Sequence, residues 1–270
     1  MAKLGQPRES VVYFADSRAK AWNYRYSVPA KLEELIARMD LSRYIEPGEY
    51  VAIKAHLGSP GCFRVIRPNF LRMIADAVKD VGGKPFVTDS VRMMGWEYLD
   101  NANRLGINHS SLGVPVVLAD GMYGRDGVVV KAGPVLGKTT IASAIYDAPA
   151  MVVVSHCKGH IEAGYAGAMK NLAMGAVCSR DRSGSTRYTR GRMHAVYQRS
   201  LRWDKSVCTL CGNCEAVCPL GAIQIVGKKV VRDTSLCWLC LRCARVCPEG
   251  ALISTMKQEE FQLGMAETVR

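Results

Sequence analysis

Eight of the eleven cysteines fall in two copies of one short motif, which constrains this chain more than any other feature of its sequence. Both copies read C-x2-C-x2-C-x3-C-P. The cysteines are Cys208, Cys211, Cys214 and Cys218 in the first copy, and Cys237, Cys240, Cys243 and Cys247 in the second. Between residues 208–223 and 237–252, nine of sixteen residues are identical. This part of the chain is therefore an internal duplication.

The spacing indicates iron–sulfur ligation. Three thiolates two residues apart can bind three irons of one cubane, and the fourth cysteine of each run reaches the other cluster. We therefore expect two [4Fe–4S] clusters and low-potential electron transfer. Zinc sites are disfavoured, because they usually need two C-x2-C pairs separated by a long gap. The expected ligands are Cys208, Cys211, Cys214 and Cys247 for cluster 1, and Cys237, Cys240, Cys243 and Cys218 for cluster 2.

This segment resembles the bacterial two-cluster ferredoxins. The resemblance implies a small α+β ferredoxin-like domain, which we assign to residues 204–254. One departure is that Leu210 and Leu239 stand before the second cysteine of each run, where that family often has glycine. Trp238 adds further apolar cover beside the second run.

The rest of the sequence is that of a folded globular protein, with 49% hydrophobic and 22% charged residues. No apolar run approaches the roughly 20 residues that span a bilayer, and the first residues do not resemble a secretory signal. We therefore expect no membrane span and a cytoplasmic, reducing location. The formal charge is +12, almost all of it in residues 1–203. The arginine-rich segment 180–205 carries half of this excess and either contacts an acidic partner or is only solvated, and residues 179–192 are expected to form a connector.

Residues 1–203 alternate β-branched runs with helical periodicity, which predicts an α/β domain with a mostly parallel sheet flanked by helices. Helices are expected over 70–81, over 32–39 and in the small-residue stretch 163–176. Residues 255–270 are expected to be a polar tail with room for a short helix. The expected strands are 11–15, 50–54, 84–89, 114–119, 128–131 and 151–155.

Four stretches of the larger domain resemble the family catalogued as domain of unknown function 362. They are VAIKAHLG (51–58), VTDS (87–90), HCKGHIEAGYAGAMKNL (156–172) and GRMHAV (191–196). The resemblance implies the same α/β fold, commonly with a ferredoxin module. The sequence departs from the family at His56, where asparagine is frequent, and at His156, where lysine is frequent. The implied site residues are Lys54, Asp89, Lys158, His160, Lys170, Asn171 and His194.

These residue types suit an anionic small-molecule substrate. His160 can act as a general acid near neutral pH beside Lys158 and Lys170. Two other interpretations stay open: solvated surface cations around a structurally satisfied histidine, and a metal cluster. The second is disfavoured because a strand that runs into a turn does not bring its residues onto one face. The metal cluster would use His156, Cys157, His160 and Glu162.

Several features argue against other chemistries. GPVLGKT (133–139) has three residues between its glycines where a Walker loop needs four, and no G-x-G-x-x-G follows a predicted strand. Cys62, Cys157 and Cys178 lie outside the cluster motifs and are expected to be small buried hydrophobes.

Two functions fit this sequence best. The first is a reductase, or a reductase subunit, in which the clusters exchange electrons with a substrate or cofactor in the larger domain. The alternative is an electron carrier or adaptor that has no substrate and docks onto a redox complex. Both imply a redox partner protein. Nucleic-acid binding, with Tyr188 and Tyr197 stacking on bases, is disfavoured because no binding motif accompanies the arginines.

Overall fold

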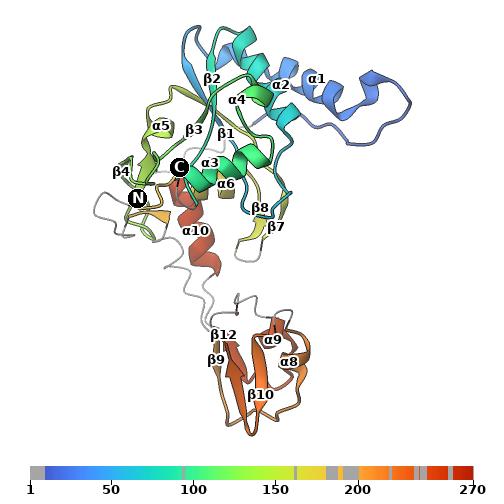
Figure 1. The fold of residues 1–270 in the computed structure, drawn as a ribbon, viewed down its shortest axis with the longest axis vertical. Coiled ribbons are helices and arrows are strands. Elements are labelled where there is room, and N and C mark those ends of the chain that lie inside the picture. The colour runs from blue at the N-terminus through green and yellow to red at the C-terminus, as the bar shows by residue number, and fades with distance from the viewer. Residues whose placement is uncertain are drawn as a thin grey trace.

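The computed structural model describes residues 10–92, 95–160, 163–180, 188–190, 201–218, 221–233, 237, 242–254 and 258–269. A four-stranded parallel sheet with the strand order β3-β2-β1-β6 organises the larger part of the chain (Figure 1). The predicted α/β architecture with a parallel sheet is confirmed. The strands are β1 (Tyr50–Lys54), β2 (Lys84–Asp89), β3 (Val116–Leu118) and β6 (Ala150–Val153).

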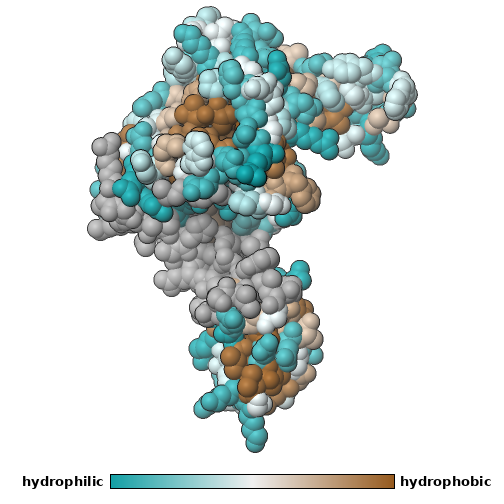
Figure 2. Space-filling model, in the orientation of Figure 1, coloured by the Kyte–Doolittle hydropathy of each residue, from teal (hydrophilic) through white to brown (hydrophobic). Residues whose placement is uncertain are grey.

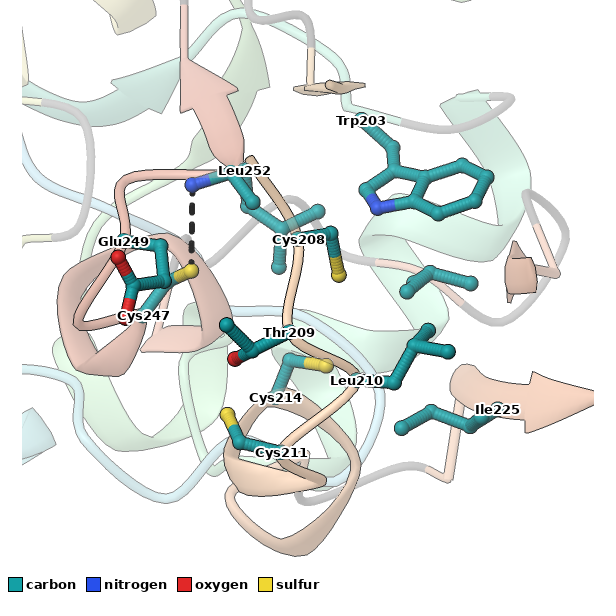
Figure 3. A pocket seen from close by; sticks show the side chains of 12 residues that line it. Trp203, Cys208, Thr209, Leu210, Cys211, Cys214, Ile225, Cys247, Glu249 and Leu252 are labelled. Carbon is teal, nitrogen blue, oxygen red and sulfur yellow. Dashed lines mark hydrogen bonds between the residues drawn. The ribbon is translucent and has the colours of Figure 1, made fainter. Parts of the chain in front are cut away.

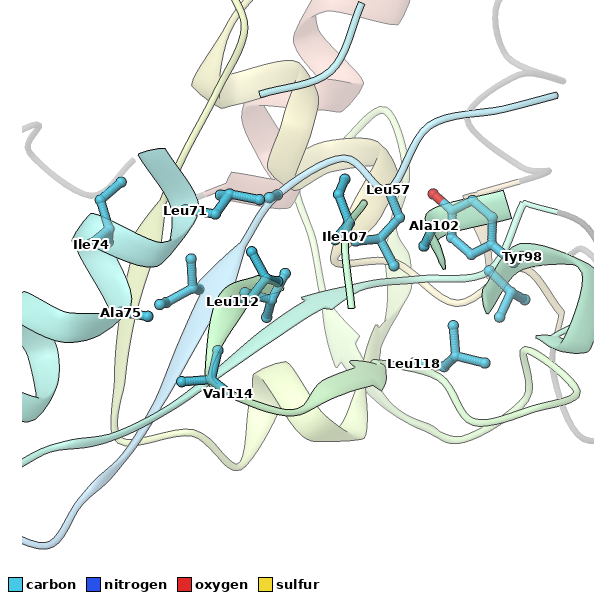
Figure 4. Close-up of a cluster of buried hydrophobic side chains, with 14 residues drawn as sticks. Leu57, Leu71, Ile74, Ala75, Tyr98, Ala102, Ile107, Leu112, Val114 and Leu118 are labelled. Atoms are coloured by element: carbon cyan, nitrogen blue, oxygen red, sulfur yellow. The ribbon is translucent and has the colours of Figure 1, made fainter. Parts of the chain in front are cut away.

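Helices pack on both faces of this sheet. On one face, α2 (Pro68–Asp80) packs against β1 and β2, and Ile53 shares a hydrophobic core with Leu71 and Ile74 (Figure 4). Successive side chains of a strand point to opposite faces, so Lys54 faces the other way. There α6 (Ala168–Gly175) contacts β1 and β6. Two neighbouring residues of β1 therefore face the apolar core, in the case of Ile53, and the polar site, in the case of Lys54.

The remaining helices of the larger part are short or peripheral. Ser27 caps α1 (Val28–Met39) by accepting a hydrogen bond from the Ala30 amide. The other helices are α3 (Gly95–Arg104), α4 (His109–Leu112), α5 (Ser143–Tyr146) and the 3-10 turns η1 (Tyr24–Tyr26) and η2 (Leu41–Arg43). In the part of the chain that the structure describes, no helix is long and apolar enough to span a membrane.

Two antiparallel hairpins lie outside the parallel sheet. The predicted strand at 128–131 is present as β4 (Gly127–Lys131), but it pairs with β5 (Lys138–Ala142) instead of joining the sheet. The stretch that resembles a Walker loop forms the turn of this hairpin. The second hairpin pairs β7 (Lys158–His160) with β8 (Gly164–Ala166), where the sequence suggested the start of a helix.

The strand predicted at 11–15 is wrong. Residues 10–16 have neither helical nor strand structure, and the side chains of Val12 and Phe14 are 83% and 86% exposed. A β-branched run becomes a strand only when a neighbouring strand accepts and donates its backbone hydrogen bonds. No described strand pairs with this run.

The described residues of the cysteine segment form two antiparallel strand pairs and two short helices. β9 (Leu201–Trp203) pairs with β12 (Leu252–Ser254), and β10 (Ile223–Val226) pairs with β11 (Lys229–Arg232). The helices are α8 (Asn213–Ala216) and α9 (Arg242–Val246). Figure 2 shows hydrophobic residues gathered at the surface of this segment, where Val226 is 58% exposed.

The chain ends in a helix that packs back on the larger part. α10 (Gln258–Val269) contacts α6, and Phe261 and Met265 are buried there together with Leu136 (Figure 1). Glu267 accepts hydrogen bonds from the amides of Val135 (2.9 Å) and Leu136 (2.8 Å) in the β4–β5 turn. The segment expected as a polar tail thus contributes to a hydrophobic core.

Candidate functional site

A cleft of about 630 Å³ opens at the carboxyl ends of the parallel strands. Its lining includes Asp89 at the end of β2, Lys158 and His160 from β7, and Lys170 and Asn171 from α6. In open α/β sheets, ligands bind at this end of the strands because the loops that follow them meet there. Five of the seven residues that the sequence singled out therefore line one cleft.

A buried ion pair forms the floor of the cleft. Lys54 Nζ lies 2.9 Å from Asp89 Oδ1, and both side chains are almost completely buried. Burial raises the pKa of Asp89, but the nearby Lys54, His56 and Tyr98 outweigh it and hold that pKa well below its ordinary range. Burial lowers the pKa of Lys54, and Asp89 opposes this shift. Asp89 is consequently a carboxylate at neutral pH and neutralises the lysine.

The second oxygen of Asp89 organises the neighbouring groups. Tyr98 donates its hydroxyl hydrogen to Oδ2 over 2.6 Å, and the amide of Leu57 donates to the same oxygen over 3.3 Å. His56 Nδ1 lies 3.2 Å from Oδ2, and its Nε2 lies 3.4 Å from Arg92 Nη1. This pattern assigns the neutral tautomer of His56 with hydrogen on Nδ1. The chain Asp89–His56–Arg92 thus runs from the buried pair to the lining of the cleft.

Asn171 links α6 to two strands of the sheet. Its Oδ1 accepts a hydrogen bond of 2.6 Å from Lys54 Nζ, while Nδ2 donates to Val154 O (3.1 Å) and Ser155 Oγ (3.0 Å). These contacts use both polar atoms of the amide. Asn171 therefore positions Lys54 and the end of β6.

Gly175 lets the ion pair approach the last turn of α6. A Cβ at this position would lie 2.2 Å from Asp89 Oδ1 and 2.3 Å from Lys54 Nζ. Both atoms are fixed by their own contacts, so neither can move away cheaply. A glycine is required here because of space and not because of its backbone angles.

Arg190 also lines the cleft. Its guanidinium donates to Ser90 Oγ (3.3 Å), Met174 O (3.3 Å) and Ser179 Oγ (2.7 Å), and also to Val91 O. Burial lowers its pKa, and Asp89 is the first of the groups that oppose this shift. Burial raises the pKa of Asp120 to about 6. Its carboxyl group accepts hydrogen bonds from the amides of Val91 and Ser179.

The lining of the cleft is strongly basic. Asp89 is the one acidic side chain among the described residues that line it, and Lys54 neutralises that charge. An excess of cations in a concave site attracts anions from solution. The basic and imidazole side chains are His56, Arg64, Arg92, His156, Lys158, His160, Lys170 and Arg190.

A second cavity lies in the cysteine segment. Cys208, Cys211 and Cys214 of the first run line it together with Cys247 of the second run (Figure 3). The indole of Trp203 lies at the same cavity. Four thiols from two distant stretches of sequence are thus brought around one space.

The two cysteine runs repeat their local hydrogen bonds. The amide of Ala222 donates to Cys218 Sγ over 3.2 Å, and the amide of Ala251 donates to Cys247 Sγ over 3.2 Å. In each run the donor follows the fourth cysteine by four residues, so the sequence duplication is also a structural one. Cys218 and Cys243 pack against the same hydrophobic cluster as Cys214.

Comparison with known protein families matches residues 51–267 to the family described as Domain of unknown function (DUF362). The chain belongs to this family. The DUF362 match includes the strands that carry the cleft, the cysteine segment and most of α10. No match was found among curated proteins or among solved structures.

The DUF362 site residues chosen from the sequence differ in their burial and in their position relative to the cleft. Lys54 is fully buried and Asp89 is paired with it, whereas Lys158, His160 and Lys170 line the cleft. His194, Cys240 and Glu162 lie outside the described residues. No group of three His, Cys, Asp or Glu side chains suited to a single metal ion occurs in the part of this DUF362 chain that the structure describes.

Sequence reasoning missed four residues of this site. Tyr98, Arg92, Arg190 and Gly175 belong to it only through contacts between distant segments. Arg190 was part of an arginine-rich stretch that was interpreted as a connector. Gly175 carried one usable signal: it ends a small-residue helix, where close packing of a helix on a strand requires the smallest side chain.

Proposed function

We propose that this DUF362 protein is an iron–sulfur redox protein whose two [4Fe–4S] clusters pass low-potential electrons to a small anionic substrate in the basic cleft. One observation carries the proposal: Cys247 lines the same cavity as Cys208, Cys211 and Cys214. A fourth ligand from the other run is what the duplicated motif requires. When bound, each cluster would supply a one-electron centre of low potential.

The residues present suit such clusters. Four thiols around one cavity match the donor set of a cubane, and the Ala251 amide already donates toward Cys247 Sγ. Amide donors to the ligand sulfurs stabilise the negative charge of a reduced cluster. For cluster 2, Cys218, Cys237 and Cys243 are the described members of the proposed set, and Cys240 completes it.

In the cleft, the cations would hold the substrate and His160 would donate a hydrogen bond to it. Lys158 and Lys170 are half-buried lysines that line the cleft, and neither is part of the Lys54–Asp89 pair. His160 Nδ1 accepts a hydrogen bond from the Ala163 amide over 3.3 Å, so the proton of its neutral ring is on Nε2. The Nε2 hydrogen would then donate a hydrogen bond to the substrate, and the proton that matches each electron would reach the substrate from solvent. The electrons themselves would come from a redox partner protein.

The metal content of anaerobically prepared protein tests the cluster assignment. We expect about eight irons and eight sulfides per chain, and about half of these in a Cys247→Ala variant. Cys178→Ala is the matched control, because this buried thiol lies outside both runs and burial raises its pKa to about 12. Protein that contains zinc in place of iron, or a Cys247→Ala variant with a full complement of iron, would contradict the proposal.

The cleft is tested with the same preparation after reduction by dithionite. Phosphate, sulfite and succinate serve as anionic probes, with binding followed by calorimetry and reoxidation followed by the visible absorbance of the clusters. Binding in the cleft that is weakened by Lys170→Ala supports the reductase. Fully loaded protein that binds none of these anions would favour the carrier without a substrate.

A further inference from the structure

The indole nitrogen of Trp203 is a buried hydrogen-bond donor with no acceptor among the described residues. Trp203 is the last residue of β9, and its backbone is held in register opposite Leu252 of β12. Buried N–H groups are nearly always paired, because burial removes the water that would otherwise accept their hydrogen. An orphaned donor therefore indicates an acceptor that the polypeptide itself does not supply.

The position of the indole indicates which acceptor this is. Trp203 lines the cavity formed by Cys208, Cys211, Cys214 and Cys247. In Figure 3 the nitrogen is on the edge of the ring nearest to Cys208. The lining also includes Thr209 and Glu249, but neither forms a hydrogen bond with the indole, and the four cysteine sulfurs are the acceptors expected there once the cavity is filled.

The second repeat provides an independent observation. Arg232 stands five residues before Cys237, and its Nη1 lies 4.0 Å from Cys237 Sγ. Trp203 stands at the corresponding position of the first repeat, five residues before Cys208. Both residues end a strand, β9 in the first repeat and β11 in the second. Each repeat thus carries a side-chain N–H donor at the same place relative to its first cysteine.

We propose that Trp203 and Arg232 are paired tuning donors, which hydrogen-bond the first cysteine sulfur of cluster 1 and cluster 2 respectively and make the two clusters electronically different. This inference rests on the proposed function. A hydrogen bond to a ligand sulfur stabilises the reduced cluster more than the oxidised one, because the added electron increases the negative charge on sulfur. The neutral indole does this by its dipole alone, whereas the guanidinium adds a full positive charge. Cluster 2 is therefore the more easily reduced of the two.

Potentiometric titration followed by electron paramagnetic resonance tests the proposal on the intact, anaerobically prepared chain. In Trp203→Phe we expect the ratio of reduced to oxidised cluster 1 at a fixed potential to fall about tenfold, which is about 59 mV for one electron. Cluster 2 should keep its potential. Arg232→Gln should show the reverse pattern.

Two control variants separate tuning from general effects. Trp96→Phe alters a tryptophan that is 73% exposed on α3, and Arg202→Gln removes the same charge from an exposed position next to Trp203. Trp96→Phe should shift the potential of cluster 1 less than Trp203→Phe does. Arg202→Gln should shift the potential of cluster 2 less than Arg232→Gln does. Unchanged potentials in both Trp203→Phe and Arg232→Gln would overturn the proposal, whereas a chain without iron would overturn the proposed function instead.

A second measurement needs no change at Trp203. Tryptophan labelled with ¹⁵N in the indole is incorporated into a Trp238→Phe variant, and pulsed electron paramagnetic resonance of the reduced protein is recorded. A ¹⁵N coupling to one cluster, together with an exchangeable proton that disappears in heavy water, supports the hydrogen bond. Loaded protein without either coupling would overturn it. A tryptophan that served only to fill space would leave neither signature.

Discussion

Asp89 shows how much of this site depends on one side chain. Its two oxygens contact Lys54, His56, the Leu57 amide and the Tyr98 hydroxyl, which come from two separate segments. The resemblance of VTDS to a known family was enough to select Asp89, but not to assign its role. The local sequence around an aspartate at the end of a strand does not reveal whether its side chain faces solvent or a buried lysine. Its partners are set by the packing of β1, β2 and α3.

Removing the charge of Asp89 should destabilise the protein strongly at neutral pH. In Asp89→Asn the ammonium of Lys54 stays buried without a counter-charge, which typically costs about 3–5 kcal/mol. Because the pKa of Asp89 is lowered in the folded chain, its contribution is complete above the unfolded pKa of about 3.9 and is lost as the pH falls further. The gap between variant and parent should therefore narrow below about pH 4.

Urea unfolding at pH 7 and at lower pH measures this gap. The exposed pair of Glu34 and Arg38 provides the control, since Glu34→Gln should cost under about 1 kcal/mol. Equal stability of Asp89→Asn and its parent at pH 7 would show that the pair does not support the fold.

At the scale of elements, the sequence predicted best where burial is continuous. β1 and β2 match their predicted bounds, because both strands consist largely of apolar and β-branched residues that are covered on two faces. The β7–β8 hairpin was missed because its strands, KGH and GYA, are three residues long and have no apolar pattern. The run at 11–15 failed for the opposite reason: it has the pattern of a strand but no neighbour to pair with.

The packing of α6 on the ion pair can be tested with two glycines of the same cleft. Gly175→Ala should destabilise the protein by about 1–3 kcal/mol, because the new methyl overlaps fixed atoms of Asp89 and Lys54. Gly159 on β7 is the matched control, since a Cβ there meets nothing within 4 Å. Thermal unfolding of both variants provides the comparison. Equal losses at the two positions would mean that crowding at the ion pair is not the cause.

Across the whole molecule, the route of the chain was the feature hardest to infer from sequence. Residues 255–270 contain enough polar residues to be interpreted as a tail, yet α10 buries Phe261 completely and binds the β4–β5 turn through Glu267. Neither contact has a local signature, because the partners lie far away in the sequence. The family match to residue 267 agrees with a fold that includes this helix.

Two large-to-small changes on α10 test its role in the fold. Phe261→Ala should cost about 3–5 kcal/mol, because it removes a fully buried ring from the contact with α6. Leu263→Ala on the same helix should have little effect, since Leu263 is 56% exposed. Limited proteolysis and thermal unfolding of the intact chain measure the stability of both variants. A harmless Phe261→Ala would mean that α10 is dispensable.

The pairing of β9 with β12 has a topological consequence. Because the first and last strands of the cysteine segment are neighbours, the chain leaves and rejoins the larger part through a two-stranded stem about 5 Å across. Whatever lies beyond such a stem can be lengthened, shortened or exchanged without rerouting the backbone that leads to α10. The hydrophobic interior of the larger part is therefore independent of the length of the cysteine segment beyond the stem.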